Sequence, residues 1–206
     1  MLDWIEQGGI ILMLIGVASL VAMAVVMERF ATFRSIDRHN NRFIKKFYDL
    51  LQVRQFKTAE DLCREINSPI SRMALAGLEA SDRPKEDIRE ILVHAGSKEI
   101  PVIEARLGIL STIAYISPLM GLLGTVLGLI HSFQDFHMAL ERQQMGPAIM
   151  AEGIWKALIT TVAGLTVGII SYILHSILYT KKEHLILDLE GSSHELLVIF
   201  TEDDQS

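Results

Sequence analysis

The chain has 206 residues, half of them hydrophobic, and a formal net charge of −6. Its single cysteine, Cys63, excludes a disulfide within the chain and a cysteine-based metal or redox motif, and we expect no cofactor. The negative charge comes largely from the residues after Thr180, where two basic and seven acidic side chains sum to −5, so no nucleic-acid partner is expected.

Three long stretches lack Asp, Glu, Lys and Arg, at residues 7–27, 107–134 and 157–180. About 20 mostly apolar residues suffice to cross a bilayer as a helix. We therefore predict an all-α integral membrane protein with three transmembrane helices. The first stretch follows the acidic segment Met1–Glu6, whereas a signal peptide begins with positive charge. We expect it to be retained as transmembrane helix 1, within residues 1–27.

Residues 28–106 are too charged for a bilayer and too long for a loop. Their apolar residues recur at three- and four-residue spacing, which predicts a long helical extension. Ser68–Pro69 predicts a new helix, which the serine caps and the proline opens. Residues 80–84 predict a second break. From Lys85 we predict a helix that runs with little interruption into the second span and is kinked at Pro101.

The remainder divides into transmembrane helix 2 (107–131), a short connection (132–152), transmembrane helix 3 (153–180) and a helical tail (181–206). Basic residues favour the cytoplasmic side of a membrane, and they follow the first span, precede the second and follow the third. We therefore expect residues 28–106 and the tail in the cytoplasm. The N-terminus and the 132–152 connection are expected outside, in the periplasm.

Small residues occupy one face of each of the last two spans. Glycines at three- and four-residue spacing share a helix face, and small residues let helices approach closely in a bilayer. We predict that these glycines pack helices together, both within the chain and between copies of it. They are Gly121, Gly124 and Gly128 in the second span, and Gly164 and Gly168 in the third.

We do not expect an enzyme, because the sequence has no Ser/His/Asp grouping, phosphate loop or metal-ligand cluster. Proton and ion pathways through a bilayer usually carry an ionisable group in mid-span, and the cores of spans two and three contain none. They contain hydroxyls, which form hydrogen bonds but store no proton. If protons pass here, the titrating carboxylate belongs to another chain. The alternative for each threonine is a hydrogen bond to its own helix.

Glu152 and Lys156 lie four residues apart where span three enters the membrane. An acid placed four residues before a base favours an ion pair on a helix. Three interpretations stay open, namely a structural pair, a wet mouth of a polar pathway, or two unpaired surface residues.

Two linked motifs carry a resemblance to a known family. The segments Pro118–Gly128 (PLMGLLGTVLG) and Gly153–Leu165 (GIWKALITTVAGL) resemble the ExbB/TolQ branch of the MotA/TolQ/ExbB proton-channel family. The lead-in Glu104–Ala114 is similar to the family as well. The order of three spans and the long cytoplasmic segment also fit, so the resemblance covers nearly the whole chain.

This resemblance implies a bacterial inner-membrane subunit that forms a ring, usually a pentamer, around two copies of a single-span ExbD/TolR-like partner with a mid-membrane aspartate. Proton flow would drive movement of that partner and deliver work to a TonB- or TolA-like protein. Thr125 and Thr161 match the family's pore-facing threonines, and Thr160 is taken with them as a candidate pathway residue. Glu152 and Lys156 are candidates for the pore mouth. Span one would lie against membrane lipids.

The sequence departs from the family pattern at Lys156, where many relatives have a glutamate, so no role of that glutamate is carried over. Late in span three, where the family often has a proline, residues 167–170 contain none, so no kink is expected there. The alternatives are a flagellar-type stator subunit driven by protons or sodium, which usually has four spans, and a membrane scaffold without ion flux. The choice between protons and sodium stays open.

Overall fold

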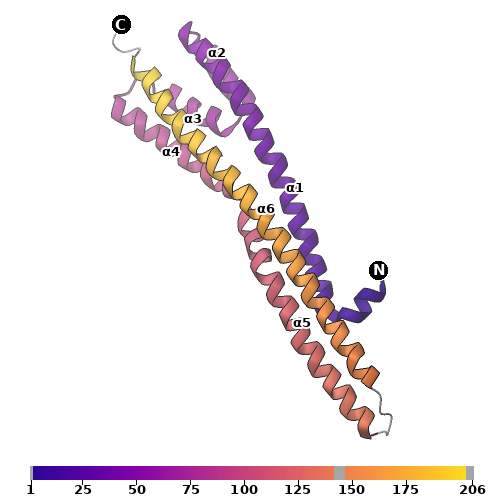
Figure 1. The fold of residues 1–206 in the computed structure, drawn as a ribbon. Helices are drawn as coiled ribbons and strands as arrows, with labels where there is room; N and C mark the ends of the chain where they lie inside the picture. The colour runs from indigo at the N-terminus through magenta and orange to yellow at the C-terminus, as the bar shows by residue number, and fades with distance from the viewer. Residues whose placement is uncertain (1, 142–146, 203–206) are drawn as a thin grey trace. The chain divides into compact units, whose positions relative to one another are not determined.

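The computed structural model describes residues 2–141 and 147–202, and within these ranges every regular element is an α-helix (Figure 1). The helices are α1 (Leu2–Gln52), α2 (Phe56–Ile66), α3 (Pro69–Leu78), α4 (Lys85–Glu104), α5 (Leu107–Glu141) and α6 (Pro147–Glu202). By length and composition, three helical stretches can cross a membrane, namely Gly9–Gln52, Lys85–Ala139 and Met150–Phe200. The all-α class with three spans is therefore confirmed.

Internal contacts divide the chain into two compact units. Unit 1 consists of Met1–Met27 and Arg106–Ile177 and holds the three apolar stretches. Unit 2 consists of Glu28–Ala105 and Leu178–Ser206 and holds most of the charged residues. Both α1 and α6 contribute to both units, because each continues as one helix from an apolar stretch into a charged one.

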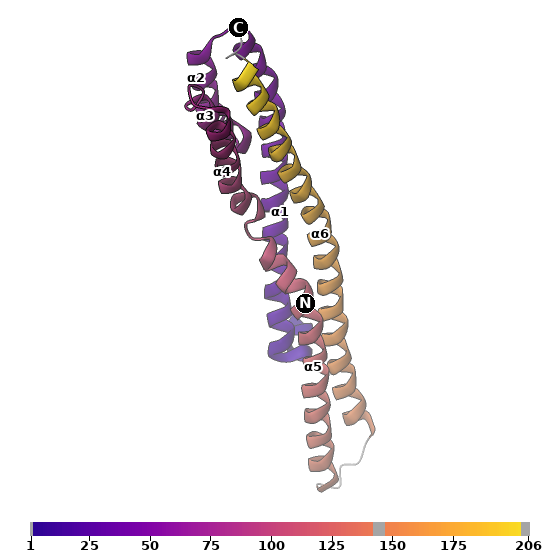
Figure 2. The ribbon, with the colours of Figure 1, turned by 90° about the vertical axis from the view of Figure 1, so that its left-hand side faces the viewer.

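In unit 1, α5 and α6 run antiparallel and side by side, as both ribbon views show (Figures 1 and 2). The first part of α1 packs against them and contains a break at Gly9, which has φ 60° and ψ −160°. Glycine adopts such a backbone without the steric penalty that a Cβ brings. Gly9 therefore lets α1 change direction beside the α5–α6 pair.

The core of unit 2 is built from the amphipathic faces of five helices. Phe43 and Phe47 of α1 stack with ring centroids 4.9 Å apart. Around them lie buried apolar residues of α2, α3, α4 and the last turns of α6, among them Met73 and Leu196. The predicted start of α3 is confirmed, since the Ser68 side chain accepts a hydrogen bond from the backbone of Ser71 in a capping box.

Two ion pairs connect α4 to other helices of unit 2. Arg72 Nε donates to Glu99 Oε1 at 2.7 Å, and Arg72 Nη2 pairs with the second carboxylate oxygen. Lys182 of α6, whose side chain is 7% exposed, lies 3.1 Å from Glu104. These contacts hold α4 against α3 and α6, and Lys182 also pairs with Glu183 at 2.6 Å.

The helix predicted to run from Lys85 into the second span with little interruption is interrupted at two residues, Ala105 and Arg106. The helix continues past Pro101 to Glu104, but it ends at Ala105, where ψ is 138°, and Arg106 has φ 64°. Proline removes one backbone hydrogen bond and disfavours helical geometry in the residue before it. Here the helical hydrogen bonding is instead interrupted after Pro101. The interruption lies where the charged helix ends and the apolar one begins.

The predicted connection over 132–152 is mostly helix. Helix α5 extends to Glu141 and α6 begins at Pro147, and the residues between them lie outside the described ranges. Proline is well suited to the first position of a helix, because its missing N–H has no partner there in any case. Each helix therefore extends beyond its apolar stretch.

Cys63 lies in the core of unit 2 and is 1% exposed. Burial raises the pKa of its thiol to about 12, and the nearby Glu60 carboxylate acts in the same direction. Thiol reagents attack the thiolate, which forms only as the pH rises towards that value. We expect Ellman's reagent at pH 8 to leave the folded protein unmodified and to modify one thiol per chain after denaturation. Rapid reaction of the folded protein would contradict the burial of Cys63.

Candidate functional site

The close approach of α5 and α6 depends on two glycines that face each other. A methyl group added to Gly164 would lie 2.5 Å from the carbonyl oxygen of Ser117 and 2.8 Å from Cα of Gly121. One added to Gly121 would lie 3.0 Å from Cα of Thr161. These neighbours are backbone atoms, which cannot rotate away. Small residues are what permit such backbone contact between membrane helices.

The other three predicted packing glycines lie along the same contact. A methyl group on Gly128 would meet Cβ of Ala157 at 2.6 Å, and one on Gly168 would meet Cγ of Pro118 at 2.5 Å. One on Gly124 would lie 2.3 Å from Oγ1 of Thr160. All five glycines thus contact the opposite helix of the same chain. Their packing between copies of the chain stays a prediction.

Thr161 and Thr125 bring two hydroxyls together from different helices. Thr161 Oγ1 donates to the carbonyl oxygen of Gly121 at 2.8 Å and lies 3.4 Å from Thr125 Oγ1. Thr125 Oγ1 donates to the carbonyl oxygen of Leu122 at 2.6 Å, within its own helix. Both side chains are partly exposed on the single chain. A partner that touches this surface therefore meets polar oxygen atoms within an otherwise apolar span.

Thr160 differs from Thr161 although the two are adjacent. It is 2% exposed, donates to the carbonyl oxygen of Ala157 at 2.7 Å and lies 3.4 Å from that of Gly121. Adjacent residues of an α-helix point about 100° apart, because a turn takes about 3.6 residues. Thr160 consequently faces the interior of unit 1, and its place on an ion pathway stays a prediction.

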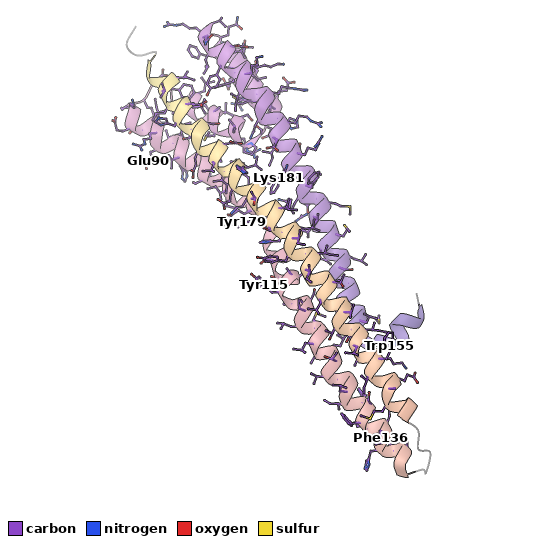
Figure 3. All side chains as sticks on the ribbon, in the orientation of Figure 1. Glu90, Tyr115, Phe136, Trp155, Tyr179 and Lys181 are labelled. Atoms are coloured by element: carbon purple, nitrogen blue, oxygen red, sulfur yellow. The ribbon has the colours of Figure 1, made fainter. Side chains whose placement is uncertain are left out.

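Glu152 and Lys156 form the ion pair that their spacing favours. Lys156 Nζ lies 2.8 Å from Glu152 Oε1, and the side chains are 37% and 67% exposed for Lys156 and Glu152 respectively. Trp155 lies beside them on the surface of α6, near the end of the α5–α6 pair where Phe136 lies on α5 (Figure 3). A cation and an anion are therefore present where the apolar part of α6 begins.

The structure also contains a cavity that we did not predict from the sequence. This hairpin pocket, of about 410 Å³, lies between the α1 break at Gly9–Ile11, α5 and α6. Its polar lining side chains are His131, Ser132, Asp135, Glu152, Lys156 and Thr160. The four-residue spacing of His131 and Asp135 places them on one face of α5. That spacing was visible in the sequence, but nothing there placed Glu152 and Lys156 opposite them.

A family model, the MotA/TolQ/ExbB proton channel family, matches residues 65–191, which is more than half of the chain. The matched range includes all of α3, α4 and α5 and most of α6, and it excludes α1. It therefore contains both helices that carry the glycine contact and the threonine pair.

Full-length relatives agree with this match. An ExbB-like protein 3 of Synechocystis sp. is 28% identical over 187 residues, 89% of each chain. An ExbB homologue of Methanothermobacter thermautotrophicus is 29% identical over 85% of this chain, which spans 61% of that longer protein. The Tol-Pal system protein TolQ of Pseudomonas aeruginosa is 26% identical over 82% of this chain and 77% of its own length. Because the family model matches more than half of a chain with three candidate membrane-spanning helices, this chain belongs to the MotA/TolQ/ExbB proton channel family.

Proposed function

We propose that the chain is a ring-forming subunit of an inner-membrane proton-channel motor. In this proposal several copies, five in the usual arrangement, surround two copies of a single-span ExbD/TolR-like partner. The partner supplies an aspartate within the membrane, and proton flow moves the partner relative to the ring. The work is delivered to a TonB- or TolA-like protein or to another periplasmic load.

The observation that carries this proposal is the threonine pair in a span without ionisable side chains. Thr125 and Thr161 present hydroxyls 3.4 Å apart on a partly exposed surface, while residues 157–174 of α6 and 107–130 of α5 contain no Asp, Glu, Lys, Arg or His. Hydroxyls donate and accept hydrogen bonds but do not titrate in the physiological range. A surface of this kind suits contact with a carboxylate that belongs to the partner and itself takes up and releases the proton.

The orientation follows from charge. Basic residues after the first span and after the third favour the cytoplasm for unit 2. The N-terminus and the end of the α5–α6 pair then lie in the periplasm. The resemblance to ExbB and TolQ proteins supports the bacterial inner membrane as the location, with α1 on the lipid side of the ring. We expect neither enzymatic activity nor a bound cofactor.

Reconstitution tests the proposal. The chain is purified with an ExbD/TolR-like partner and placed in vesicles with a membrane potential, and proton uptake is followed with an internal pH dye. We expect uptake by the complex, none by the chain alone, and none when the partner's membrane aspartate is replaced by asparagine. A complex that takes up neither protons nor sodium would favour the scaffold function. Proton uptake by the chain alone would contradict the assignment of the titrating aspartate to the partner.

A further inference from the structure

The hairpin pocket lies on a different side of the α5–α6 pair from the threonine pair. Ile11 of α1 is near Gly124 on this side, where a methyl group on Gly124 would be 3.3 Å from Ile11 Cγ2. Along α5 the pocket extends from Asp135 past His131 to Gly124. Gly124 and His131 are seven positions apart, which corresponds to about 10 Å along the helix at ~1.5 Å per residue. The pocket therefore penetrates well into the apolar part of unit 1.

A single carbonyl oxygen lies between the floor of the pocket and the threonine pair. Thr160 lines the pocket, and its Oγ1 lies 3.4 Å from the carbonyl oxygen of Gly121. The same oxygen accepts the hydrogen bond of Thr161 at 2.8 Å. The two polar regions are thus joined through one backbone group, since both hydroxyls lie within 3.4 Å of the same carbonyl oxygen.

The pocket is polar and large enough to hold water. A water molecule occupies about 30 Å³ in the liquid and needs two to four polar partners, and the pocket has about 410 Å³ with six polar side chains. Outside the pocket lining, Ser117 of α5 is 1% exposed, and its Oγ has no hydrogen-bond partner among the described residues. A water molecule can form the hydrogen bond that such a buried hydroxyl lacks within the protein.

Four ionisable side chains determine the field in this pocket, as far as the described residues go. Asp135 and Glu152 carry negative charge, Lys156 carries positive charge, and His131 is the fourth. Lys156 is held beside Glu152 at 2.8 Å, so its charge is partly compensated. Charges that line a cleft change the local concentration of a mobile ion and its rate of arrival.

We propose that the hairpin pocket is the water-filled access route by which the transported cation reaches the Thr125–Thr161 pair, and that the Glu152–Lys156 pair sets its electrostatic barrier. This inference rests on the proposed function and on its orientation, which places the pocket outside. A carbonyl oxygen has no proton to hand on. The last step, past Gly121, therefore needs water beside Thr160 or rotation of the Thr160 side chain.

The two members of the ion pair have opposite expected effects on flux. Lys156→Met removes the positive charge and leaves Glu152, so proton uptake by the reconstituted complex at low external proton concentration should rise, on the order of threefold to tenfold. Glu152→Gln leaves Lys156 uncompensated, and uptake should fall by a similar factor. Both differences should shrink near 1 M salt, where the Debye length is about 3 Å.

A structural role of the pair predicts something else. Losing a structural contact has the same consequence whichever partner is replaced, so both variants would then lower uptake together or leave it unchanged. Either of those results overturns the inference. Both side chains are at least one-third exposed, and surface substitutions rarely change stability by more than about 0.5 kcal/mol. Elution of the variant complexes in gel filtration at the position of the unmodified complex verifies their assembly.

Water in the pocket is tested separately with a cysteine at Leu127, which is 39% exposed and lines the pocket. The native Cys63 is buried, so we expect it not to react with the reagent. We expect a methanethiosulfonate with a cationic head to label Leu127→Cys in vesicles and to slow uptake. Met13→Cys is the matched control, since Met13 is 55% exposed and is not among the residues that line the pocket. It should stay unlabelled in lipid.

Absence of labelling at Leu127→Cys, or equal labelling at Met13→Cys, would overturn the access route. These outcomes are distinguishable from failure of the proposed function. If the function is wrong, the unmodified complex takes up no cation. If only the access route is wrong, the unmodified complex takes up protons normally. The two charge variants then either lower uptake together or leave it unchanged, and the thiol label leaves it unaltered.

Discussion

Replacing Thr161 with valine is expected to abolish proton uptake by the reconstituted complex while the complex itself still assembles. Valine has nearly the shape of threonine but lacks the hydroxyl that donates to Gly121 and lies 3.4 Å from Thr125. The loss of one interhelical hydrogen bond in a membrane costs only about 0.6 kcal/mol on average. Assembly should therefore survive, whereas a carboxylate that approaches this surface loses its polar contact. Proton uptake with an internal pH dye, at matched protein content, measures the effect.

Thr166→Val is the matched control for this experiment. Thr166 lies on the same helix, is exposed, and donates to the carbonyl oxygen of Val162 in its own helix at 2.8 Å. Its hydroxyl takes no part in the described α5–α6 contact, so uptake should stay close to that of the unmodified complex. Normal uptake by Thr161→Val would count directly against a functional threonine pair. Equal loss in both variants would point to a general effect of removing hydroxyls from α6.

Replacing Gly164 with alanine is expected to destabilise the α5–α6 pair by about 1–3 kcal/mol, the range typical of overpacking. The added methyl group would lie 2.5 Å from Ser117 O and 2.8 Å from Gly121 Cα. Both are backbone atoms, so the two helices have to separate. The gain of up to about 1 kcal/mol that alanine brings to a helix interior is too small to offset this. Thermal unfolding in detergent and the amount of intact complex in gel filtration should both decrease.

Gly16→Ala separates this steric effect from the general consequence of replacing a glycine in a span. A methyl group on Gly16 would meet nothing within 4 Å in the single chain. The helix preference of alanine then acts alone, and stability should rise slightly or stay unchanged. If Gly164→Ala is as stable as Gly16→Ala, the close backbone contact of Gly164 with Gly121 is not required for folding.

Several features could be read from the sequence because local chemistry decides them. The three apolar stretches are long enough to cross a bilayer whatever they pack against. The start of α3 depends on Ser68 and Pro69, which act within one helical turn. The glycine faces of spans two and three follow from helical periodicity alone. The pairing of Glu152 with Lys156 likewise depends only on their spacing in α6.

Other features depended on contacts between segments far apart in the chain. The interruption before span two lies at Ala105 and Arg106, although Pro101 was the nearest signal in the sequence. The kink at Pro101 stays a prediction. Residues 132–141 continue α5, although their composition suggested a connection. A segment that mixes polar and apolar residues can form either a helix or a loop. Tertiary packing then overrides its weak local preference for one of them.

For the threonines, too, the sequence determined one part and the tertiary structure another. The sequence identified Thr125, Thr160 and Thr161 as polar groups in apolar spans without a titrating side chain, so any proton pathway here requires a titrating group from another chain. Only the tertiary structure separated the buried Thr160 from the partly exposed Thr161, and only it placed His131 and Asp135 opposite Glu152 and Lys156 around one pocket. The reason is that helical periodicity specifies which residues share a face, whereas the face that becomes buried depends on which helix packs against it.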